Sequence, residues 1–503
     1  MTRENSFNLI DEPWLPVVDV GLVSLRQIFS EPTYRALGGN PLQKIAITKL
    51  LLAIAQSAAT PANDDEWAIM GEKGMASKCL AYLEKWHDRF WLYGERPFLQ
   101  MPAIALAVVQ PLGAVLPEVA TGNTTVLTQI HIEKYLSNAD KALLLLVLMG
   151  FGMGGKKTDN SVVLSPGYLG KVNEKGKQAT SKPGPSLGFS GFLHSFLLGG
   201  ELMETLWLNL LTAEQIAEMR VFTVGLGQAP WEQMPTGEAC PEAINLQYSL
   251  MGRLLPLSRF CLLTTSGLHY SEGIAHAGYK EGMADPSVAV DYTGKVAKVL
   301  WIDPEKRPWR FLTAVLSFLG SNSASYYNCL QIRGGLKRAR EHARALGVWS
   351  GGLRVSSNAG EQFVSGSDDF VESVVMLPKA YLGEIWFNRL QQEMVELDQL
   401  AKIVYSSTLN YFKTQGMDGK PQAALASNLF WQLSERQFQK LVDGCDEPTQ
   451  VKVLRLRFAD FVRQSYRRQC PNDTARQLEA WAKNQPNLGR YLIDSTQPQE
   501  AKA

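Results

Sequence analysis

The chain has 503 residues, which is too long for a single hydrophobic core, so we expect roughly two to four structural units. Its content of 45% hydrophobic and 20% charged residues is ordinary for a globular protein and excludes a largely disordered chain. The formal net charge of +1 excludes binding to nucleic acid through the overall charge of the molecule.

The first residues, MTRENSFNLIDEPW, lack the apolar stretch of a signal peptide. The longest apolar run, ALLLLVLM at 142–149, falls far short of the roughly 20 residues that span a bilayer. We therefore expect a cytoplasmic protein without a membrane partner. Six cysteines are scattered without a C-x-x-C pair, so we expect them to be reduced and mostly buried, with no zinc site and no cofactor.

The N-terminal part begins with a predicted strand, turn and strand over residues 7–29, where Ser24 caps a short helix. A helix is predicted from Pro41 and ends before Pro61, and another over 76–93 closes at Gly94. Residues 99–122 carry proline, glycine and short apolar runs, which indicates irregular structure.

Residues 150–157, GFGMGGKK, match the first seven positions of a phosphate-binding G-x-x-x-x-G-K loop, but Lys157 stands where a Ser or Thr would hold magnesium. Such a loop follows a strand and opens a helix. Leu, Ala and Met in 142–149 favour a helix before it, and the proline- and glycine-rich run after it disfavours a helix there. A P-loop-like ATP-dependent enzyme, with Asp303 of VLWID as its acid, is therefore the weaker alternative.

Three segments are locally basic. Six lysines lie within 156–182, in a stretch whose composition predicts a mobile loop, and further basic runs occupy 333–344 and 452–468. A single run of this kind is as often a solvated surface as a binding site. Three together favour a polyanionic partner, because each Lys or Arg placed against a phosphate releases counterions.

The second half predicts strands broken by turns over 244–302, with AKVLWID at 297–303 the clearest. After about residue 370 the pattern changes to four amphipathic segments separated by GMDGKP, DGCDEP and CPND, which is typical of a helical bundle. The expected fold class is α+β, with a large mixed α/β domain over 1–370 and a C-terminal four-helix bundle over 371–503.

No arrangement of residues indicates catalysis. His87 and Asp88 resemble an H-D metal pair, but the other histidines supply no paired spacing, so a surface helix is the better interpretation. What stands out is a set of polar, glycine-bearing loops at 120–131, 150–157 and 350–360. Glycines allow the backbone to approach a ligand closely, so these loops together with the basic runs predict a protein that holds nucleic acid without cleaving it.

An ordered set of motifs resembles one known family. The motifs are FNLIDEPWLPV, RFWLYGERPFLQM, LPEVATGNTTVL, GFGMGG, APWE and GGLRVSSNA, and they span most of the first 360 residues. They occur in this order in the CasA family, the large subunit of the type I-E Cascade complex of CRISPR defence. A large subunit of another type I CRISPR subtype is an alternative.

The resemblance implies a non-enzymatic subunit that contacts the 5′ handle of the guide RNA and associates with the other Cascade subunits. It implies recognition of the protospacer-adjacent motif in double-stranded DNA through the minor groove, opening of the duplex for R-loop formation, and recruitment of a helicase-nuclease. The groove is only about 6 Å wide, which suits backbone better than side chains. The residues matched to the glycine loop are Gly152, Gly154 and Gly155, with Lys156 and Lys157 expected against the flanking phosphates.

Further sites follow from the same resemblance. The stretch after Arg354 matches the wedge that enters the duplex; it comprises Ser356, Ser357, Asn358 and Ala359. If one residue is inserted relative to the family, Asn358 takes the place of the wedge glutamine; without an insertion, Ser357 takes that place. Both side chains are shorter than glutamine, which predicts a weaker wedge. The loop expected at the guide-RNA handle carries Asn123, Thr124, Leu127 and Gln129.

The lysine finger of the family is matched near Glu272, which cannot replace a cation. Lys280 or His276 is a possible substitute, or the finger is absent, and a motif preference unlike that of lysine-bearing relatives is expected. In the bundle, the basic third segment is expected to hold the displaced strand through phosphate contacts. The residues proposed to contact the DNA backbone are Arg354, Arg455, Arg463 and Arg467.

Overall fold

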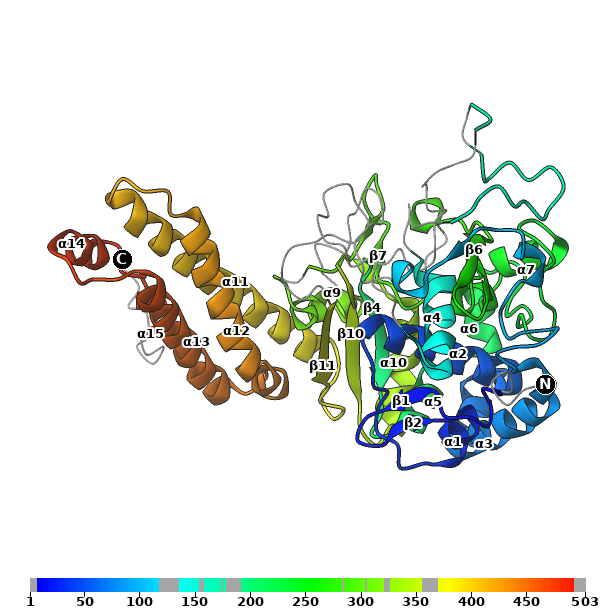
Figure 1. Cartoon of the computed structure of the whole chain (residues 1–503). Coiled ribbons are helices and arrows are strands. Elements are labelled where there is room, and N and C mark those ends of the chain that lie inside the picture. The colour runs from blue at the N-terminus through cyan, green and yellow to red at the C-terminus, as the bar shows by residue number, and fades with distance from the viewer. Residues whose placement is uncertain are drawn as a thin grey trace. The chain divides into compact units, whose positions relative to one another are not determined.

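The computed structural model describes residues 7–116, 135–152, 158–172, 175–177, 191–282, 285–303, 305–320, 326–354 and 370–492. The chain divides into two compact units (Figure 1). The first comprises Met1–Phe318 and Ser323–Val374, and the second comprises Leu319–Asn322 and Val375–Ala503. The fold class is the predicted one, a mixed α/β region with small sheets followed by a helical bundle.

The strands of the first unit form small sheets rather than one large sheet. A hairpin pairs β1 (Leu15–Val17) with β2 (Gly21–Val23), and three-stranded sheets have the orders β11-β10-β4, β3-β6-β5 and β8-β7-β9. Their bounds are β3 Val109–Gln110, β4 His194–Leu198, β5 Arg259–Leu263, β6 Leu268–Glu272, β7 Val290–Asp291, β8 Lys298–Val299, β9 Tyr327–Asn328, β10 Gly347–Leu353 and β11 Phe370–Met376. The pairs β4–β10 and β5–β6 are antiparallel.

The α-helices of the first unit pack against one another and against these sheets. They are α1 Leu25–Ser30, α2 Pro41–Ala59, α3 Asp64–Lys85, α4 Asn138–Phe151, α5 Leu202–Leu208, α6 Ala213–Glu218, α7 Pro241–Gln247, α8 Met251–Leu254, α9 Leu312–Val315 and α10 Leu330–His342. Short 3-10 helices occur at η2 His87–Arg89, η3 Pro102–Ile104, η4 Leu112–Ala114, η6 Tyr279–Glu281, η7 Pro308–Phe311 and η8 Ser317–Leu319.

Helix α2 forms the centre of the first unit. It packs against α3, α4, α5, α8 and β10, and most of its side chains are buried. Its start at Pro41 and its end before Pro61 are confirmed, and Asn40 caps it through the backbone N–H of Gln43. The predicted cap of α1 by Ser24 is also confirmed. These helices were predictable because their ends are set by local residues.

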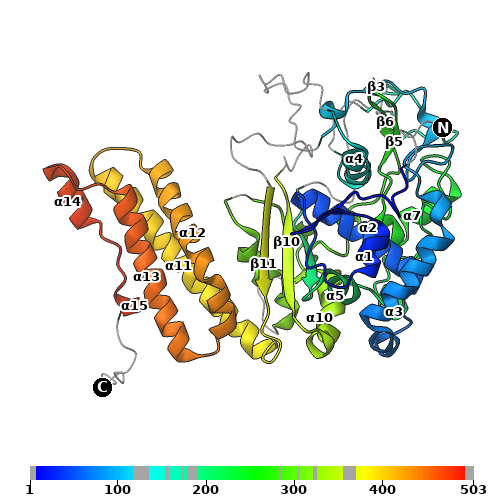
Figure 2. The ribbon, with the colours of Figure 1, turned by 60° about the horizontal axis from the view of Figure 1, so that its bottom comes forward.

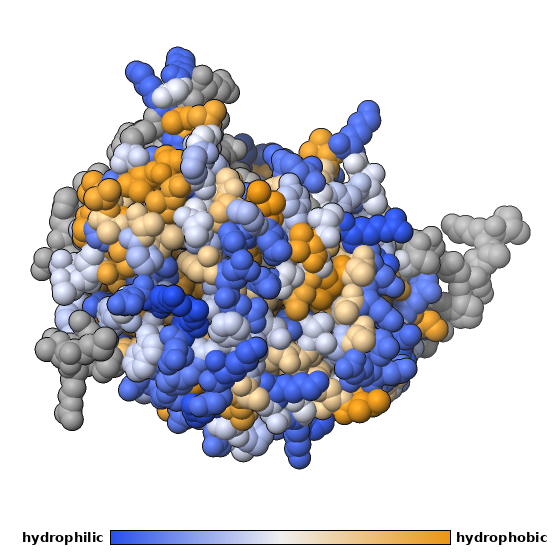
Figure 3. Space-filling view, turned by 90° about the vertical axis from the view of Figure 1, so that its right-hand side faces the viewer, coloured by the Kyte–Doolittle hydropathy of each residue, from blue (hydrophilic) through white to orange (hydrophobic). Residues whose placement is uncertain are grey.

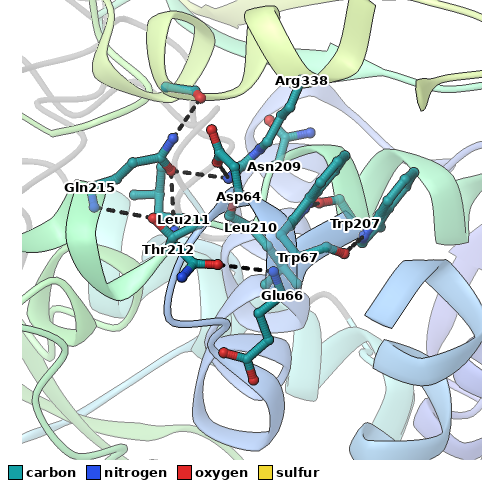
Figure 4. A network of polar contacts seen from close by, with 12 residues as sticks. Asp64, Glu66, Trp67, Trp207, Asn209, Leu210, Leu211, Thr212, Gln215 and Arg338 are labelled. Carbon is teal, nitrogen blue, oxygen red and sulfur yellow. Dashed lines mark hydrogen bonds and ion pairs between the residues drawn. The ribbon is translucent and has the colours of Figure 1, made fainter. Parts of the chain in front are cut away.

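Tryptophans join α3 to α5 in the core of the same unit (Figure 4). The indoles of Trp67 and Trp207 stack with centroids 3.9 Å apart and an interplanar angle of 2°. Each indole N–H donates to the main-chain oxygen of the other residue, at 2.9 Å and 3.2 Å. The guanidinium of Arg338 on α10 lies over Trp67, 4.7 Å from the ring centroid, and bonds Asp64 and Gln215. Three helices are thereby fixed to one another.

Three predicted elements were wrong in their bounds or type. The helix predicted over 76–93 begins earlier, at Asp64, because Asn63 caps it, and Gly71 breaks its regular geometry with a φ of 59°. Residues 244–302 contain α7 and α8 as well as strands, and β8 has only two residues. The first C-terminal segment begins as strand β11 beside β10, and its helix starts only at Glu384.

The second unit is a helical bundle in which Figure 2 shows the three long helices α11, α12 and α13 side by side, with the shorter α14 after them. They are α11 Glu384–Thr414, α12 Lys420–Gly444, α13 Pro448–Gln469 and α14 Ala475–Lys483, followed by α15 Gly489–Leu492. Leucine, phenylalanine and tryptophan side chains at helical spacing fill its core. The four amphipathic segments predicted from the sequence are confirmed as α11–α14.

The six cysteines are free, and all but the partly exposed Cys240 are buried, as predicted. Burial raises the pKa of the Cys329 thiol to about 12, which disfavours the reactive thiolate. In the described ranges, no single helix is long and apolar enough to cross a membrane, although the bent pair α2 and α3 passes by length and composition when taken together.

The face of the first unit seen in Figure 3 intersperses hydrophilic and hydrophobic residues. The chain as a whole carries a formal net charge of only +1. Any electrostatic attraction for a polyanion therefore has to come from local groups of cations, and these are located below.

Candidate nucleic-acid interface

The glycine-rich stretch follows a helix, not a strand. The predicted helix over 142–149 is confirmed as part of α4, which ends at Phe151, with Gly152 as its C-terminal cap. The N–H of Gly152 donates to the carbonyl of Leu148 at 3.1 Å, and the carbonyl of Met149 accepts from the N–H and the Oγ of Ser258 at 2.9 Å and 2.6 Å. The end of α4 is thus bonded to the chain immediately before β5.

Glycine is required at position 152 by packing. A Cβ there would lie 2.7 Å from Cγ of Arg259, 2.8 Å from the hydroxyl of Tyr270 and 2.9 Å from the carbonyl oxygen of Leu148. Real Cβ contacts are essentially never this short, so a side chain would displace β5, β6 or the end of α4. Gly152, the first of the three glycines matched to the family's glycine loop, therefore has a structural role that is separate from any approach to a ligand.

The surroundings do not form a nucleotide-binding loop. Helix α4 stands where the motif needs a strand, and the described residues 158–172 contain no helix. Asp303 accepts the backbone N–H of Lys306 and of Glu305 in a turn, and the strand before it, β8, pairs with β7 in antiparallel fashion. The helix before the motif, the absence of a helix within 158–172 and the turn at Asp303 all add to the sequence-based argument against an ATP-dependent enzyme.

Most of the residues that the resemblance assigned to DNA or RNA lie outside the described residues. This holds for Gly154, Gly155, Lys156 and Lys157, for Ser356, Ser357, Asn358 and Ala359, and for Asn123, Thr124, Leu127 and Gln129. The structure does describe the residues from which two of these segments start. Gly152 is the C-terminal cap of α4, and Arg354 is half-buried directly after β10.

One lysine of the basic stretch 156–182 is buried, although the composition of this stretch predicts a mobile loop. Lys171 is buried and pairs with the equally buried Glu238, with 2.6 Å between Nζ and Oε1. Its ammonium also donates to the carbonyl of Val162 at 2.7 Å and to Ser271 at 2.8 Å. Composition suggested a solvated lysine, but a partner far along the sequence draws this one into the interior.

Glu238 joins the segment after the glycine stretch to the rest of the unit. Besides Lys171, its carboxylate accepts the backbone N–H of Ser165 at 2.8 Å and that of Leu164 at 3.1 Å. Burial opposes ionisation of Glu238, but the hydrogen bond and charge of Lys171 outweigh burial and lower its pKa. The carboxylate is therefore ionised and fully bonded.

Of the two candidate replacements for the lysine finger, only Lys280 is exposed. It lies on η6, a turn closed by the N–H of Gly278 donating to Glu281 at 2.8 Å. His276 is 1% exposed, bonds the carbonyl of Pro256 at 2.7 Å, and has a pKa lowered to about 3 by burial and by the charge of Arg253. His276 is therefore neutral and inaccessible, which excludes it as a cationic finger.

The turn at Asp285 and Pro286 is fixed by a buried ion pair. Asp285 bonds the ammonium of Lys49 on α2, and Lys49 also donates to the carbonyl of Arg253 at 3.0 Å. Asp285 further accepts the N–H and hydroxyl of Ser287 at 3.0 Å and 2.8 Å. The segment that follows Lys280 is thus anchored to the central helix.

The cations of the basic run over 333–344 fall into two groups, those with partners inside the protein and those that are exposed. Arg338 is 3% exposed and belongs to the tryptophan network, and Arg344 pairs with Glu72, Glu201 and Glu204. The other cations of α10 are exposed and recur at helical spacing, namely Arg333, Lys337 and Arg340. The sequence showed the charge of this helix but not which cations have internal partners.

The proposed DNA contacts of the bundle differ in their availability. Arg455 makes a two-pronged contact with the buried Glu393 of α11, at 2.9 Å and 2.5 Å, so its guanidinium is engaged within the bundle. Arg463 is partly buried, whereas Arg467 and its neighbour Arg468 are exposed in the last turn of α13. The exposed pair is the better placed to meet phosphates.

His87 has a structural partner. Its Nε2 lies 2.6 Å from Asp11 of the N-terminal NLIDEPW motif, and Asn8 of that motif donates to the carbonyl of His87 at 3.1 Å. The predicted surface helix is a single 3-10 turn. Within the described ranges, no group of three or more His, Cys, Asp or Glu residues is arranged to hold a metal ion.

Comparison with known proteins gives consistent matches along the chain. The model of the CRISPR-associated protein Cse1 family matches residues 8–477. The CRISPR-associated protein CasA/Cse1 of Thermus thermophilus is 26% identical over 534 residues, covering 97% of both chains.

Solved structures show the same fold. The crystal structure of CasA from Thermus thermophilus has a TM-score of 0.73 at 21% identity and covers 97% of this chain and 99% of its own. Thermobifida fusca Cse1 has a TM-score of 0.75 at 18% identity, covering 98% and 99%. A structure described as a CRISPR RNA-guided surveillance complex contains a chain with a TM-score of 0.68 at 16% identity, covering 95% and 98%.

Proposed function

Because the chain belongs to the CRISPR-associated Cse1 family, the CasA large subunits of type I-E Cascade, we propose that it recognises the protospacer-adjacent motif for an RNA-guided surveillance complex. In this role it binds the minor groove of double-stranded DNA, helps to open the duplex for R-loop formation and recruits a helicase-nuclease. It catalyses no reaction itself. Its other partners are the 5′ handle of the guide RNA and the remaining subunits of the complex.

The observation that carries the proposal is the attachment of the glycine stretch. The chain leaves α4 at Gly152, where only glycine fits, and it re-enters the described structure beside β6, where the N–H of Asp159 donates to the carbonyl of Tyr270 at 2.8 Å. Between them lie Gly154 and Gly155, followed by Lys156 and Lys157. Glycines suit close approach of backbone to a narrow groove, and the lysines suit the phosphates beside it.

Four further sites belong to the proposal. Ser356, Ser357, Asn358 and Ala359 form the wedge after Arg354, and Asn123, Thr124, Leu127 and Gln129 contact the guide RNA. Lys280 is the candidate cation for the groove, since it is exposed on an anchored turn. Arg467 and Arg468 hold the displaced strand.

The function is tested by assembling the chain with its guide-RNA complex and measuring affinity for duplexes with and without the motif. Gly154→Pro is expected to abolish the preference for the motif while the complex still assembles, because proline adds bulk and removes an N–H. Lys280→Ala is the second variant, and an unchanged preference removes Lys280 from the site. ATP turnover by the purified chain that is lost in Lys156→Ala would instead establish the nucleotide-dependent enzyme.

A second test concerns the bundle. Arg467→Gln together with Arg468→Gln is expected to reduce the slope of log affinity against log salt by about 1.4 for single-stranded contacts, at about 0.7 for each phosphate contact removed. Salt titration of target binding measures this slope. Arg455→Gln is the matched control on the same helix; because its guanidinium is engaged by Glu393, the slope should stay that of the wild type. An unaltered slope in the double variant would remove these arginines from the DNA contact.

A further inference from the structure

We propose that the first unit binds a small inorganic anion, of the size of chloride, as the counter-ion of the buried Arg253, in a cavity where α2, α4 and α8 meet. Lys49 of α2 and Arg253 of α8 are its ligands, since both side chains line this cavity. Neither nucleic acid nor another subunit takes part in this site.

The cavity is small and joins three helices around its two cations. It measures about 10 Å³, which is room for one water-sized particle. Apart from Lys49 and Arg253, its walls are largely apolar and include Ala46 of α2, Leu146, Met149 and Phe151 of α4, and Pro256 after α8. Apolar walls exclude water, so the interaction between a cation and an anion is stronger here than at the surface.

Arg253 is fully buried without a carboxylate partner. Its exposed fraction is 0%, and it forms no ion pair with any carboxylate in the described ranges. Nη1 and Nη2 donate over long distances, 3.3 Å and 3.4 Å, to the carbonyls of Ala277 and Gln247. Nε has no hydrogen-bond partner. A buried charge that lacks a counter-charge strongly destabilises a fold, so this guanidinium needs an anion.

The charges around the cavity do not balance without one. Asp285 is the carboxylate whose charge acts on Arg253, but it is bonded to the ammonium of Lys49. Tyr292 also acts on Arg253, yet burial raises the pKa of this phenol to about 12, so it is neutral at pH 7. Burial lowers the pKa of Arg253 to about 10, which leaves it charged. Two buried cations therefore face one carboxylate, and the end of α4 adds only partial negative charge.

The polar side chains of the cavity are donors. Lysine and arginine carry N–H groups and no acceptor. Two carbonyls of the lining residues are already engaged, that of Arg253 by Lys49 at 3.0 Å and that of Met149 by the N–H and hydroxyl of Ser258 at 2.9 Å and 2.6 Å. An occupant therefore mainly accepts hydrogen bonds. This suits a halide ion better than water, whose own hydrogens need acceptors.

Thermal unfolding of the full chain tests the site. Exchanging sodium gluconate for sodium chloride at constant ionic strength separates a specific ion from general screening, because gluconate is too large for the cavity. The shift in the unfolding midpoint should be about 2 °C more favourable for wild type than for Arg253→Met once chloride is about tenfold above its Kd, and this difference should saturate.

Arg338→Met is the matched control. Arg338 is also buried, but its guanidinium has a carboxylate partner, Asp64, at 3.0 Å. Its removal should therefore leave the response to chloride at the wild-type value. An equal response in wild type and Arg253→Met would overturn the proposal, because the ion would then act elsewhere on the protein.

Crystals of the wild type soaked in sodium bromide give a second measurement, which decides the matter if Arg253→Met does not fold. Bromide scatters X-rays anomalously and water does not, so an anomalous peak is expected within hydrogen-bonding distance of Arg253 and Lys49. Density in the cavity without an anomalous peak would identify a water and overturn the proposal. A peak combined with equal chloride responses would mean binding at crystal concentration only, which overturns it as well.

Discussion

Trp67→Ala should be among the most destabilising single substitutions in the first unit, with a loss of about 3–5 kcal/mol in the free energy of unfolding. The substitution removes a fully buried indole, its stack on Trp207 and its hydrogen bond to the carbonyl of residue 207. It also leaves Arg338 without the ring beneath its guanidinium. Figure 4 shows these three side chains together, and they come from α3, α5 and α10.

Chemical denaturation followed by far-ultraviolet circular dichroism measures this loss. Trp67→Phe is the matched control: it retains an aromatic ring against Trp207 but not the indole N–H, so a smaller loss is expected. Equal losses for the two variants would show that the hydrogen bond, and not the packing, dominates. A loss below about 1 kcal/mol for Trp67→Ala would contradict the assignment of this stack as a main contact of the core.

Lys171→Met is expected to lower the free energy of unfolding by about 3–5 kcal/mol, although the sequence places this lysine in a loop of surface-like composition. Its partner Glu238 would keep a carboxylate in the interior without a counter-charge, and both side chains are fully buried in the wild type. Denaturant unfolding compares this variant with Lys337→Met on the exposed face of α10, for which a change within about 0.5 kcal/mol is expected.

The double variant Lys171→Met with Glu238→Leu separates charge from packing. Replacing both partners by apolar residues removes the isolated carboxylate, so the double variant should be more stable than Lys171→Met alone. A double variant that is equally unstable would mean that the bonds of Glu238 to Leu164 and Ser165, and not the charge pair, hold this segment.

The ion pair of Lys171 and Glu238 determines in which direction the stability of the fold changes with pH. Lys171 holds the pKa of Glu238 below its ordinary value, so the stabilisation is present above that ordinary value, near 4.5, and is lost as the pH falls through the folded-state pKa. Unfolding curves of Glu238→Gln should accordingly lose less stability than the wild type on acidification. An identical acid response would show that other carboxylates control it.

Local signals in the sequence were sufficient for the helices whose ends are capped nearby. Ser24, Pro41 and the leucine-rich run before Gly152 predicted α1, α2 and α4, and the amphipathic periodicity after residue 370 predicted α11–α14. Where the signal was weaker, the prediction failed. Gly71 concealed the first turns of α3, and ESVVM was assigned to a helical segment although pairing with β10 makes it a strand.

The roles of individual charges could not be predicted in the same way. Lys171 and Arg338 lie in basic runs that favoured a polyanionic partner, and Arg455 was expected to contact DNA, yet each has a partner from a distant segment. Arg259 and Tyr270 carried no sequence signal at all, since their importance arises from how closely they approach Gly152.

By itself, therefore, the sequence determined the fold class, the helices with local caps and the resemblance to the Cse1 family, because all of these depend on residues close together in the chain or on ordered motifs. Only the tertiary structure decided which cations remain available to a polyanion and how the glycine stretch is attached. Whether a charge faces solvent or a buried partner, and whether a Cβ has room, depends on groups that folding brings together from distant positions.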